Sequence, residues 1–117
     1  GRLEQVLDNL LSNALDAAPR GTVVRVAARS VGPRVELAVR DAGPGMSAEQ
    51  RARAFDRFWR APSARRQDGG FGLGLSIVRR LVVADGGEVR LEDAPEGGLA
   101  VVVSLPAALA AAELVSA

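Results

Sequence analysis

Three polar side chains near the start of the chain have a spacing that could bind a cation or a phosphate group. Asn9, Asn13 and Asp16 follow one another at i, i+4 and i+7, and at about 100° per residue they fall in one narrow stripe of a helix. Their amide and carboxylate oxygens suit Mg²⁺, which keeps several waters and takes few protein ligands. An ordinary exposed helix face could carry the same residues, so the stripe alone leaves both interpretations open.

A second candidate site is the segment Asp41-Ala42-Gly43-Pro44-Gly45, which follows a run with strand character. A carboxylate at the end of a strand can accept a hydrogen bond from an exocyclic amine, and glycines let the backbone approach a flat ligand closely. A tight turn uses Gly and Pro in the same way. A purely structural role for this segment therefore remains the alternative.

Glycine-rich sequence runs directly into a predicted helix at residues 69–76, which read Gly-Gly-Phe-Gly-Leu-Gly-Leu-Ser. Free amide groups and the positive end of the helix dipole make such a junction an anion site, and the glycines let phosphate groups approach. Four arginines just upstream could add positive charge beside a polyphosphate, namely Arg57, Arg60, Arg65 and Arg66. This junction is the strongest indication of a phosphate ligand in the sequence.

Residue types that are missing from the sequence exclude much familiar chemistry. The 117 residues include no Cys, no His and no Tyr, and all 15 basic residues are Arg. A thiolate nucleophile, a Ser-His relay, a zinc site of the usual ligands and a P-loop lysine are therefore excluded. The remaining Asp, Asn, Arg and Ser suit hard cations and phosphate oxygens. Any catalysis by this chain is thus predicted to handle phosphate.

The candidate sites need a scaffold, which the hydrophobic pattern predicts along most of the chain. Apolar residues at 3–4 spacing predict three helices, over residues 3–18, 48–58 and 73–84. Alternating apolar residues predict four strands, over residues 22–30, 34–41, 88–92 and 99–105. The Ala-rich end of the chain, residues 107–115, is either a helix or a frayed tail.

Hairpin-linked strands with helices set apart from them indicate the α+β class, in which an antiparallel or mixed sheet is covered on one face by helices. A parallel Rossmann sheet needs strands that alternate with helices, and this chain lacks that order. The length suits one domain. We expect it over residues 1–106, followed by an Ala-rich C-terminal tail over residues 107–117.

In chain order, these candidate sites resemble the ATP-binding catalytic domain of bacterial sensor histidine kinases. Asn9 with the run Leu-Leu-Ser-Asn-Ala at residues 10–14 looks like the N box of that family, and Asp41-x-Gly43-x-Gly45 like its first glycine box. Residues 55–60, Phe-Asp-Arg-Phe-Trp-Arg, resemble the F box, and residues 70–75 the second glycine box. The resemblance covers nearly the whole chain. It implies a Bergerat-type two-layer α/β sandwich, with ATP bound between helices.

The resemblance also implies which residues bind the nucleotide. They would be Asn9, Asn13, Asp16, Asp41, Gly43, Gly45, Arg60, Gly70, Gly72, Leu73 and Gly74. Asn13 would hold Mg²⁺ with Asn9 assisting, and Asp41 would bind the adenine amino group beside a base pocket lined by the first two glycines. Arg60 would face the phosphates, and the backbone of residues 70–74 would cradle them. A lid would extend over about residues 60–71.

The function that the resemblance implies is binding of Mg-ATP and donation of its γ-phosphoryl group to a histidine on a separate dimerisation domain, in two-component signalling. The hydrolases of the superfamily carry a Glu one helical turn before the metal-binding Asn. Here that position is Asn9, and an amide cannot act as a general base. Asp16 stands where the family usually has Lys or Arg. The alternative is a nucleotide-dependent interaction module, such as an anti-sigma-type protein kinase or a degenerate kinase.

The expected partners follow from the same resemblance. They are the dimerisation and phosphoacceptor domain of the same kinase and, through it, a response regulator. The chain alone is expected to be monomeric and nearly inactive, within a homodimeric parent kinase. Its 15 basic residues alternate with 14 acidic ones, so we expect no nucleic acid partner. A cytoplasmic location is expected, including the cytoplasmic portion of a membrane-bound sensor.

Overall fold

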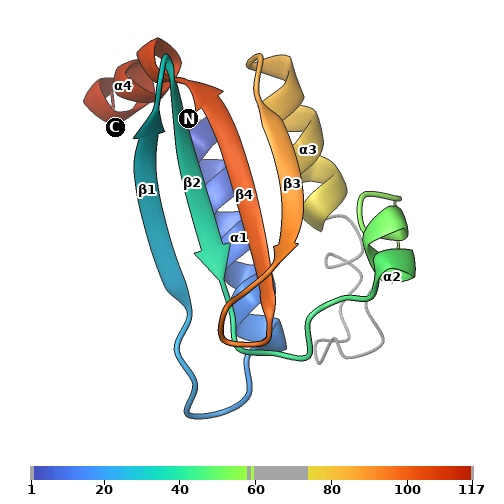
Figure 1. Ribbon diagram of the computed structural model, residues 1–117. Coiled ribbons are helices and arrows are strands. Elements are labelled where there is room, and N and C mark those ends of the chain that lie inside the picture. Colours follow the sequence, from blue (N-terminus) through green and yellow to red (C-terminus); the bar gives the residue numbers. More distant parts are fainter. Residues whose placement is uncertain (1, 58, 60–73, 117) are drawn as a thin grey trace.

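A computed structural model of the chain describes residues 2–57, 59 and 74–116 (Figure 1). Within these residues, four helices and four strands follow one another in the order α1 (Arg2–Ala17), β1 (Arg25–Val31), β2 (Arg34–Arg40), α2 (Ala48–Arg53), α3 (Gly74–Ala84), β3 (Glu88–Asp93), β4 (Leu99–Pro106) and α4 (Ala107–Ser116). Every predicted element within the described residues is present, so the sequence pattern identified the scaffold correctly.

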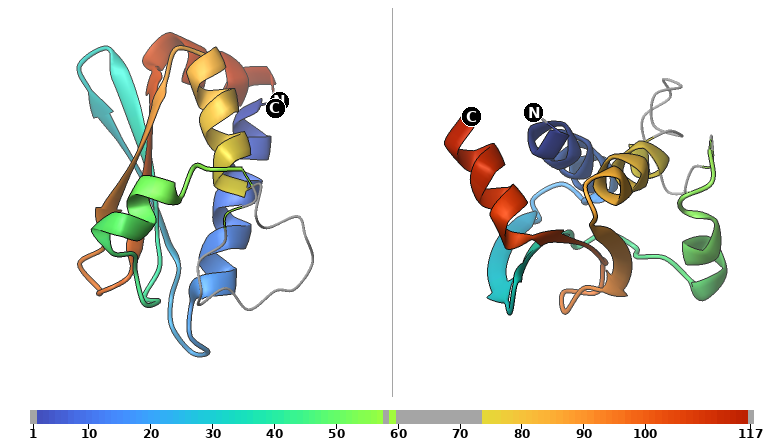
Figure 2. Two further views of the ribbon diagram at one scale, coloured as in Figure 1. Left: turned by 90° about the vertical axis from the view of Figure 1, so that its right-hand side faces the viewer. Right: turned by 90° about the horizontal axis from the view of Figure 1, so that it is seen from above.

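The strands form one sheet in the order β1-β2-β4-β3. All three neighbouring pairs are antiparallel, which decides between the two predicted sheet types. Helices α1, α3 and α4 lie on the same side of this sheet, and its opposite face carries no described helix (Figure 2). The predicted α+β class and two-layer sandwich are therefore confirmed.

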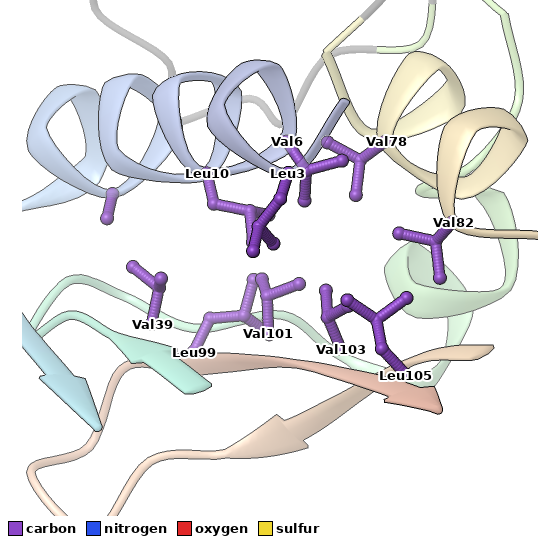
Figure 3. Packing of buried hydrophobic residues seen from close by; sticks show 11 residues of the cluster. Leu3, Val6, Leu10, Val39, Val78, Val82, Leu99, Val101, Val103 and Leu105 are labelled. Atoms are coloured by element: carbon purple, nitrogen blue, oxygen red, sulfur yellow. The ribbon is translucent and has the colours of Figure 1, made fainter. Parts of the chain in front are cut away.

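The core lies between α1, α3 and the sheet. Helix α1 buries residues at the predicted 3–4 spacing, namely Leu3, Val6, Leu10 and Ala14. Strand β4 faces them with alternate residues, namely Leu99, Val101, Val103 and Leu105. Val78 and Val82 of α3 complete the contact (Figure 3). Because α1 and α3 share this core, the packing fixes where their polar edges lie.

The helix-free face of the sheet is covered by charged side chains instead. Arg90 of β3 donates from Nη1 to Oε2 of Glu36 on β2 at 2.9 Å, and Arg29 of β1 donates to Glu36 Oε1 at 2.8 Å. These hydrogen bonds lower the pKa of Glu36 from its ordinary 4.5 to about 2. The contact between Glu36 of β2 and Arg90 of β3 therefore crosses the intervening strand β4. On this face of β4, Val102 is buried.

Most element boundaries differ from the sequence prediction by at most one residue, but the start of β1 and the end of α2 differ by more. Strand β1 begins at Arg25, not at residue 22, because the backbone N–H and the hydroxyl of Thr22 both donate to the carbonyl oxygen of Pro19 and close a turn. Helix α2 begins with a capping box between Ser47 and Gln50 and ends at Arg53, earlier than predicted.

The Ala-rich end is helical over Ala107–Ser116, so the helix is the correct one of the two predicted alternatives. Its first backbone N–H donates to the carbonyl oxygen of Pro33 at 2.9 Å, and Ala110 is buried. The helix is thus docked on the sheet. Within the described part of the chain, no helix is both long enough and apolar enough to cross a membrane.

Candidate functional site

The polar stripe of α1 lies where the prediction placed it, at the boundary between core and solvent. Asn9, Asn13 and Asp16 are all half-buried. The Nδ2 atom of Asn9 donates to the backbone carbonyl of Gln5 at 3.0 Å, one turn earlier in the helix. This bond fixes the amide group, so the carbonyl oxygen is the atom that Asn9 offers to a cation.

Helix α3 begins directly beside the stripe. Gly74, its first residue, is buried, and a β-carbon at this position would lie 2.9 Å from Nδ2 and 3.0 Å from Oδ1 of Asn13. The first turn of a helix has backbone N–H groups without partners in the helix, and its dipole favours an anion there. An amide oxygen for a cation and amide hydrogens for an anion therefore lie next to each other.

Asp41 is a buried carboxylate at the end of β2, with only 5% of its surface exposed. Its Oδ1 accepts hydrogen bonds from the backbone N–H of Gly43 at 2.8 Å and of Leu99 at 3.3 Å. Its own backbone N–H donates to the carbonyl oxygen of Leu99 at 3.1 Å. A buried carboxylate needs such donors to offset its lost hydration, and here the backbone supplies them.

The loop after β2 lies between the end of α1 and the turn that joins β3 to β4. A β-carbon on Gly43 would lie 2.6 Å from the carbonyl oxygen of Ala17, the last residue of α1. Gly45 has a φ of +70° and approaches the carbonyl oxygen of Gly97. The first two candidate sites therefore meet at the C-terminal half of α1 (Figure 1).

The remaining predicted site residues lie outside the described part of the chain. These are Arg60, Gly70, Gly72 and Leu73, together with the predicted lid over residues 60–71. Part of the predicted F box is described: the guanidinium carbon of Arg79 on α3 lies 5.3 Å from the centre of the Phe55 ring. This cation–π contact connects the segment after α2 to the helix that begins at the site.

One site residue was missed by the sequence analysis. Gly98 is buried, and a β-carbon there would collide with the carbonyl oxygen of Asp41 and lie 2.5 Å from its Oδ1. In the sequence, a Gly-Gly doublet such as Gly97-Gly98 is a general turn signal, and the residues by themselves do not show that this turn packs behind Asp41. A long-range contact of this kind needs the strand pairing to be known.

The donor atoms at the stripe fit a magnesium ion that is held partly by the nucleotide better than they fit a metal ion held by protein ligands alone. Among the described residues, no group of three or more His, Cys, Asp or Glu side chains could hold a metal ion. Mg²⁺ characteristically binds through one or two protein oxygens, with substrate phosphates and waters completing its coordination. The Asn13 amide beside the beginning of α3 fits that pattern.

Comparisons with known proteins relate the sequence and the fold to one family. Residues 1–109 match the family model described as "Histidine kinase-, DNA gyrase B-, and HSP90-like ATPase". The sensor-like histidine kinase SenX3 of Mycobacterium tuberculosis is 40% identical over 110 residues, which are 93% of this chain and 27% of SenX3. The sensor protein KdpD of Rathayibacter rathayi is 42% identical over 113 residues, 97% of this chain and 13% of KdpD.

Solved structures show the same fold. The mycobacterial sensor histidine kinase MprB superposes with a TM-score of 0.81 at 36% identity, over 90% of this chain and 72% of that one. Full-length ShkA, solved in complex with AMPPNP, gives a TM-score of 0.75 at 34% identity, over 90% of this chain and 21% of that one.

The fold and the matched residues define a catalytic, ATP-binding domain of the sensor histidine kinase type. The chain belongs to the family of histidine kinase-, DNA gyrase B-, and HSP90-like ATPases. The predicted resemblance and the predicted enzyme class are thereby confirmed. The chain spans about a quarter of SenX3 and a smaller share of KdpD.

Proposed function

We propose that this chain binds Mg-ATP between α1, the beginning of α3 and the loop after β2, and donates the γ-phosphoryl group to a histidine on a separate dimerisation domain. The observation that carries the proposal is the meeting of three different groups at one end of α1. Asn13 supplies an amide oxygen, the beginning of α3 supplies backbone N–H groups, and Asp41 supplies a buried carboxylate.

Each group has a distinct role in the proposed complex. Asp41 accepts a hydrogen bond from the amino group of adenine, with Gly43 and Gly45 beside the base. The phosphates accept hydrogen bonds from backbone N–H groups of Gly74, the first residue of α3, and of Gly70, Gly72 and Leu73 before it. Arg60 faces the same phosphates. The roles of these upstream residues are inferred from the family resemblance.

Asn13, assisted by Asn9, holds the magnesium ion, with Asp16 on the same stripe. The ion supplies charge neutralisation between neighbouring phosphates when it is bound. The chain's own residues then fix the triphosphate by position, which is the main requirement of phosphoryl transfer. Asn9 stands at the position where the resemblance places the Glu base of the hydrolases, and an amide cannot act as a general base, which favours transfer to an acceptor over hydrolysis.

The phosphoacceptor is proposed to lie on another domain because the sequence contains no His. The much longer relatives are sensor kinases, which supports a dimerisation domain of the same kinase as the partner, a response regulator as the next acceptor, a homodimeric parent and a cytoplasmic location for this domain. No nucleic acid is proposed as a partner.

The test mixes this chain with the dimerisation domain of its own kinase and ATP labelled at the γ-phosphate. The proposed transfer gives acid-labile label on the added domain and none on this chain. A chain that binds ATP but labels no acceptor would instead be the nucleotide-dependent interaction module, such as an anti-sigma-type protein kinase or a degenerate kinase.

A further inference from the structure

The two carboxylate oxygens of Asp41 have different surroundings. Oδ1 accepts both backbone hydrogen bonds, from Gly43 at 2.8 Å and from Leu99 at 3.3 Å. Among the described residues, no hydrogen bond to Oδ2 is found. Two donors from different segments hold one oxygen, so the carboxylate cannot rotate without losing both bonds. Oδ2 is therefore the oxygen that remains for a ligand.

The turn between β3 and β4 forms the wall behind this carboxylate. It is closed by hydrogen bonds from Ala94 N–H to the carbonyl of Gly98 at 2.8 Å and from Gly97 N–H to the carbonyl of Ala94 at 2.9 Å. A β-carbon on Gly98 would collide with the backbone carbonyl of Asp41 and lie 2.5 Å from Oδ1. Because the colliding atoms include backbone, no rotation of the Asp41 side chain alone could make room.

We infer that Gly98 and the backbone N–H of Leu99 are positioning groups that fix Asp41 so that Oδ2 alone contacts the base, which selects purines with an amino group at C6. The inference rests on the proposed binding of ATP. A 6-amino group donates a hydrogen bond to a carboxylate oxygen, whereas a 6-oxo group places a second acceptor against it. The discrimination depends on Oδ2 being held in place, and the turn holds it.

The same geometry predicts what the amide of asparagine would do at this position. In Asp41→Asn the side-chain oxygen takes the place of Oδ1, because the two backbone N–H groups can bond only to an acceptor. The amide NH₂ group then takes the place of Oδ2. A donor replaces an acceptor toward the base, so the preference moves from the 6-amino purine to the 6-oxo purine.

Calorimetric dissociation constants for Mg-ATP and Mg-ITP, which differ at C6, test the inference on this chain and three variants. The unchanged chain prefers ATP by about tenfold or more, the range expected for a hydrogen bond to a charged group. Gly98→Ala lowers that preference toward one. Asp41→Asn reverses it. Gly97→Ala is the control in the same turn: its φ of +99° makes alanine there strain the turn, but the added β-carbon has no atom within 4 Å and so does not touch Asp41, and this variant keeps the preference.

A merely structural role for the turn would give equal preferences in Gly98→Ala and Gly97→Ala, and that result overturns the inference. If Gly98→Ala does not fold, as judged by circular dichroism, Asp41→Asn decides, and an unchanged ATP preference in that variant overturns the inference as well. Failure of the unchanged chain to bind ATP would instead contradict the proposed function. The two failures are therefore distinguishable.

Discussion

At the scale of single residues, the proposed nucleotide site depends on polar side chains that lie against glycine backbone. Asp41 and Asn13 are polar and at least half-buried, and each lies against a glycine of another segment, Gly98 and Gly74 respectively. Because these two glycines have no side chain, the carboxylate of Asp41 and the amide of Asn13 can lie directly against them. Substitutions at the polar residues should therefore change binding selectively.

Replacing Asp41 by Ala should weaken adenine nucleotides by about 1–3 kcal/mol, because a charge-assisted hydrogen bond to the base is lost. Binding of inorganic triphosphate should stay nearly unchanged, since that ligand has no base. Calorimetry with both ligands measures the difference. Asp8→Ala, which removes an exposed carboxylate from α1, is the control. Equal losses for ATP and triphosphate in Asp41→Ala would show that Asp41 does not contact the base.

Replacing Asn13 by Ala should remove the metal ligand and make nucleotide binding insensitive to Mg²⁺. The fold should survive, because Asn13 lies at the edge of the core. Titrations of ATP with and without Mg²⁺ compare this variant with the unchanged chain. A normal Mg²⁺ dependence in Asn13→Ala would transfer the ligand role to Asn9 or Asp16.

The sequence predicted these residues by type but not their neighbours. Asn13 and Asp41 stand out because mid-helix amides cost helix propensity and a carboxylate between a strand and glycines is unusual. Gly98 did not stand out, because its contact with Asp41 joins residues far apart in the chain. Such a contact follows from the order of strands in the sheet, which hydrophobic alternation leaves open.

At the scale of elements, the helix-free face of the sheet is held by ion pairs between strands. Glu36 of β2 accepts hydrogen bonds from Arg29 of β1 and Arg90 of β3. Its pKa is lowered from 4.5 to about 2, chiefly by the hydrogen bond from Arg90 and then by that from Arg29. A lowered folded-state pKa contributes stability that is complete above the unfolded value and is lost as pH falls toward the folded value.

Glu36→Gln should therefore lower the melting temperature at pH 7 and flatten its decline between about pH 4.5 and pH 2. Near pH 2 the unchanged chain and the variant should melt at closer temperatures, because the folded carboxylate is then partly protonated. Thermal unfolding by circular dichroism across this range is the measurement. Glu88→Gln, an exposed carboxylate of β3, is the control. If the melting temperatures of the unchanged chain and of Glu36→Gln differed by the same amount at every pH, the role of Glu36 would be contradicted.

Periodicity predicted the elements well because each helix or strand has one apolar side. The 3–4 spacing of α1 and the alternation in β4 match the buried residues directly. The boundaries depended on single hydrogen bonds, such as those of Thr22 to Pro19 that delay β1. The pairing of β2 with β4 was not predictable, because α2, α3 and β3 all lie between these two strands in the chain.

At the scale of the whole molecule, the chain has the parts for holding ATP but no phosphoacceptor histidine. The family resemblance places Asn9 where the hydrolases of the superfamily carry a carboxylate base. The chain alone should therefore hydrolyse ATP slowly, below the roughly 1 per second at which kinases typically begin. Phosphate release in steady state measures this rate. Rapid hydrolysis without an added acceptor domain would place the chain with the ATPases of its family instead.

The central claim is that the groups gathered at one end of α1 bind Mg-ATP, and calorimetric titration of the chain with Mg-ATP tests it most directly. The geometry predicts binding with a dissociation constant in the micromolar to millimolar range, roughly −4 to −8 kcal/mol. The bound nucleotide should also raise the melting temperature, because it binds only the folded state. No heat and no thermal shift at several times the upper end of that range would contradict the claim.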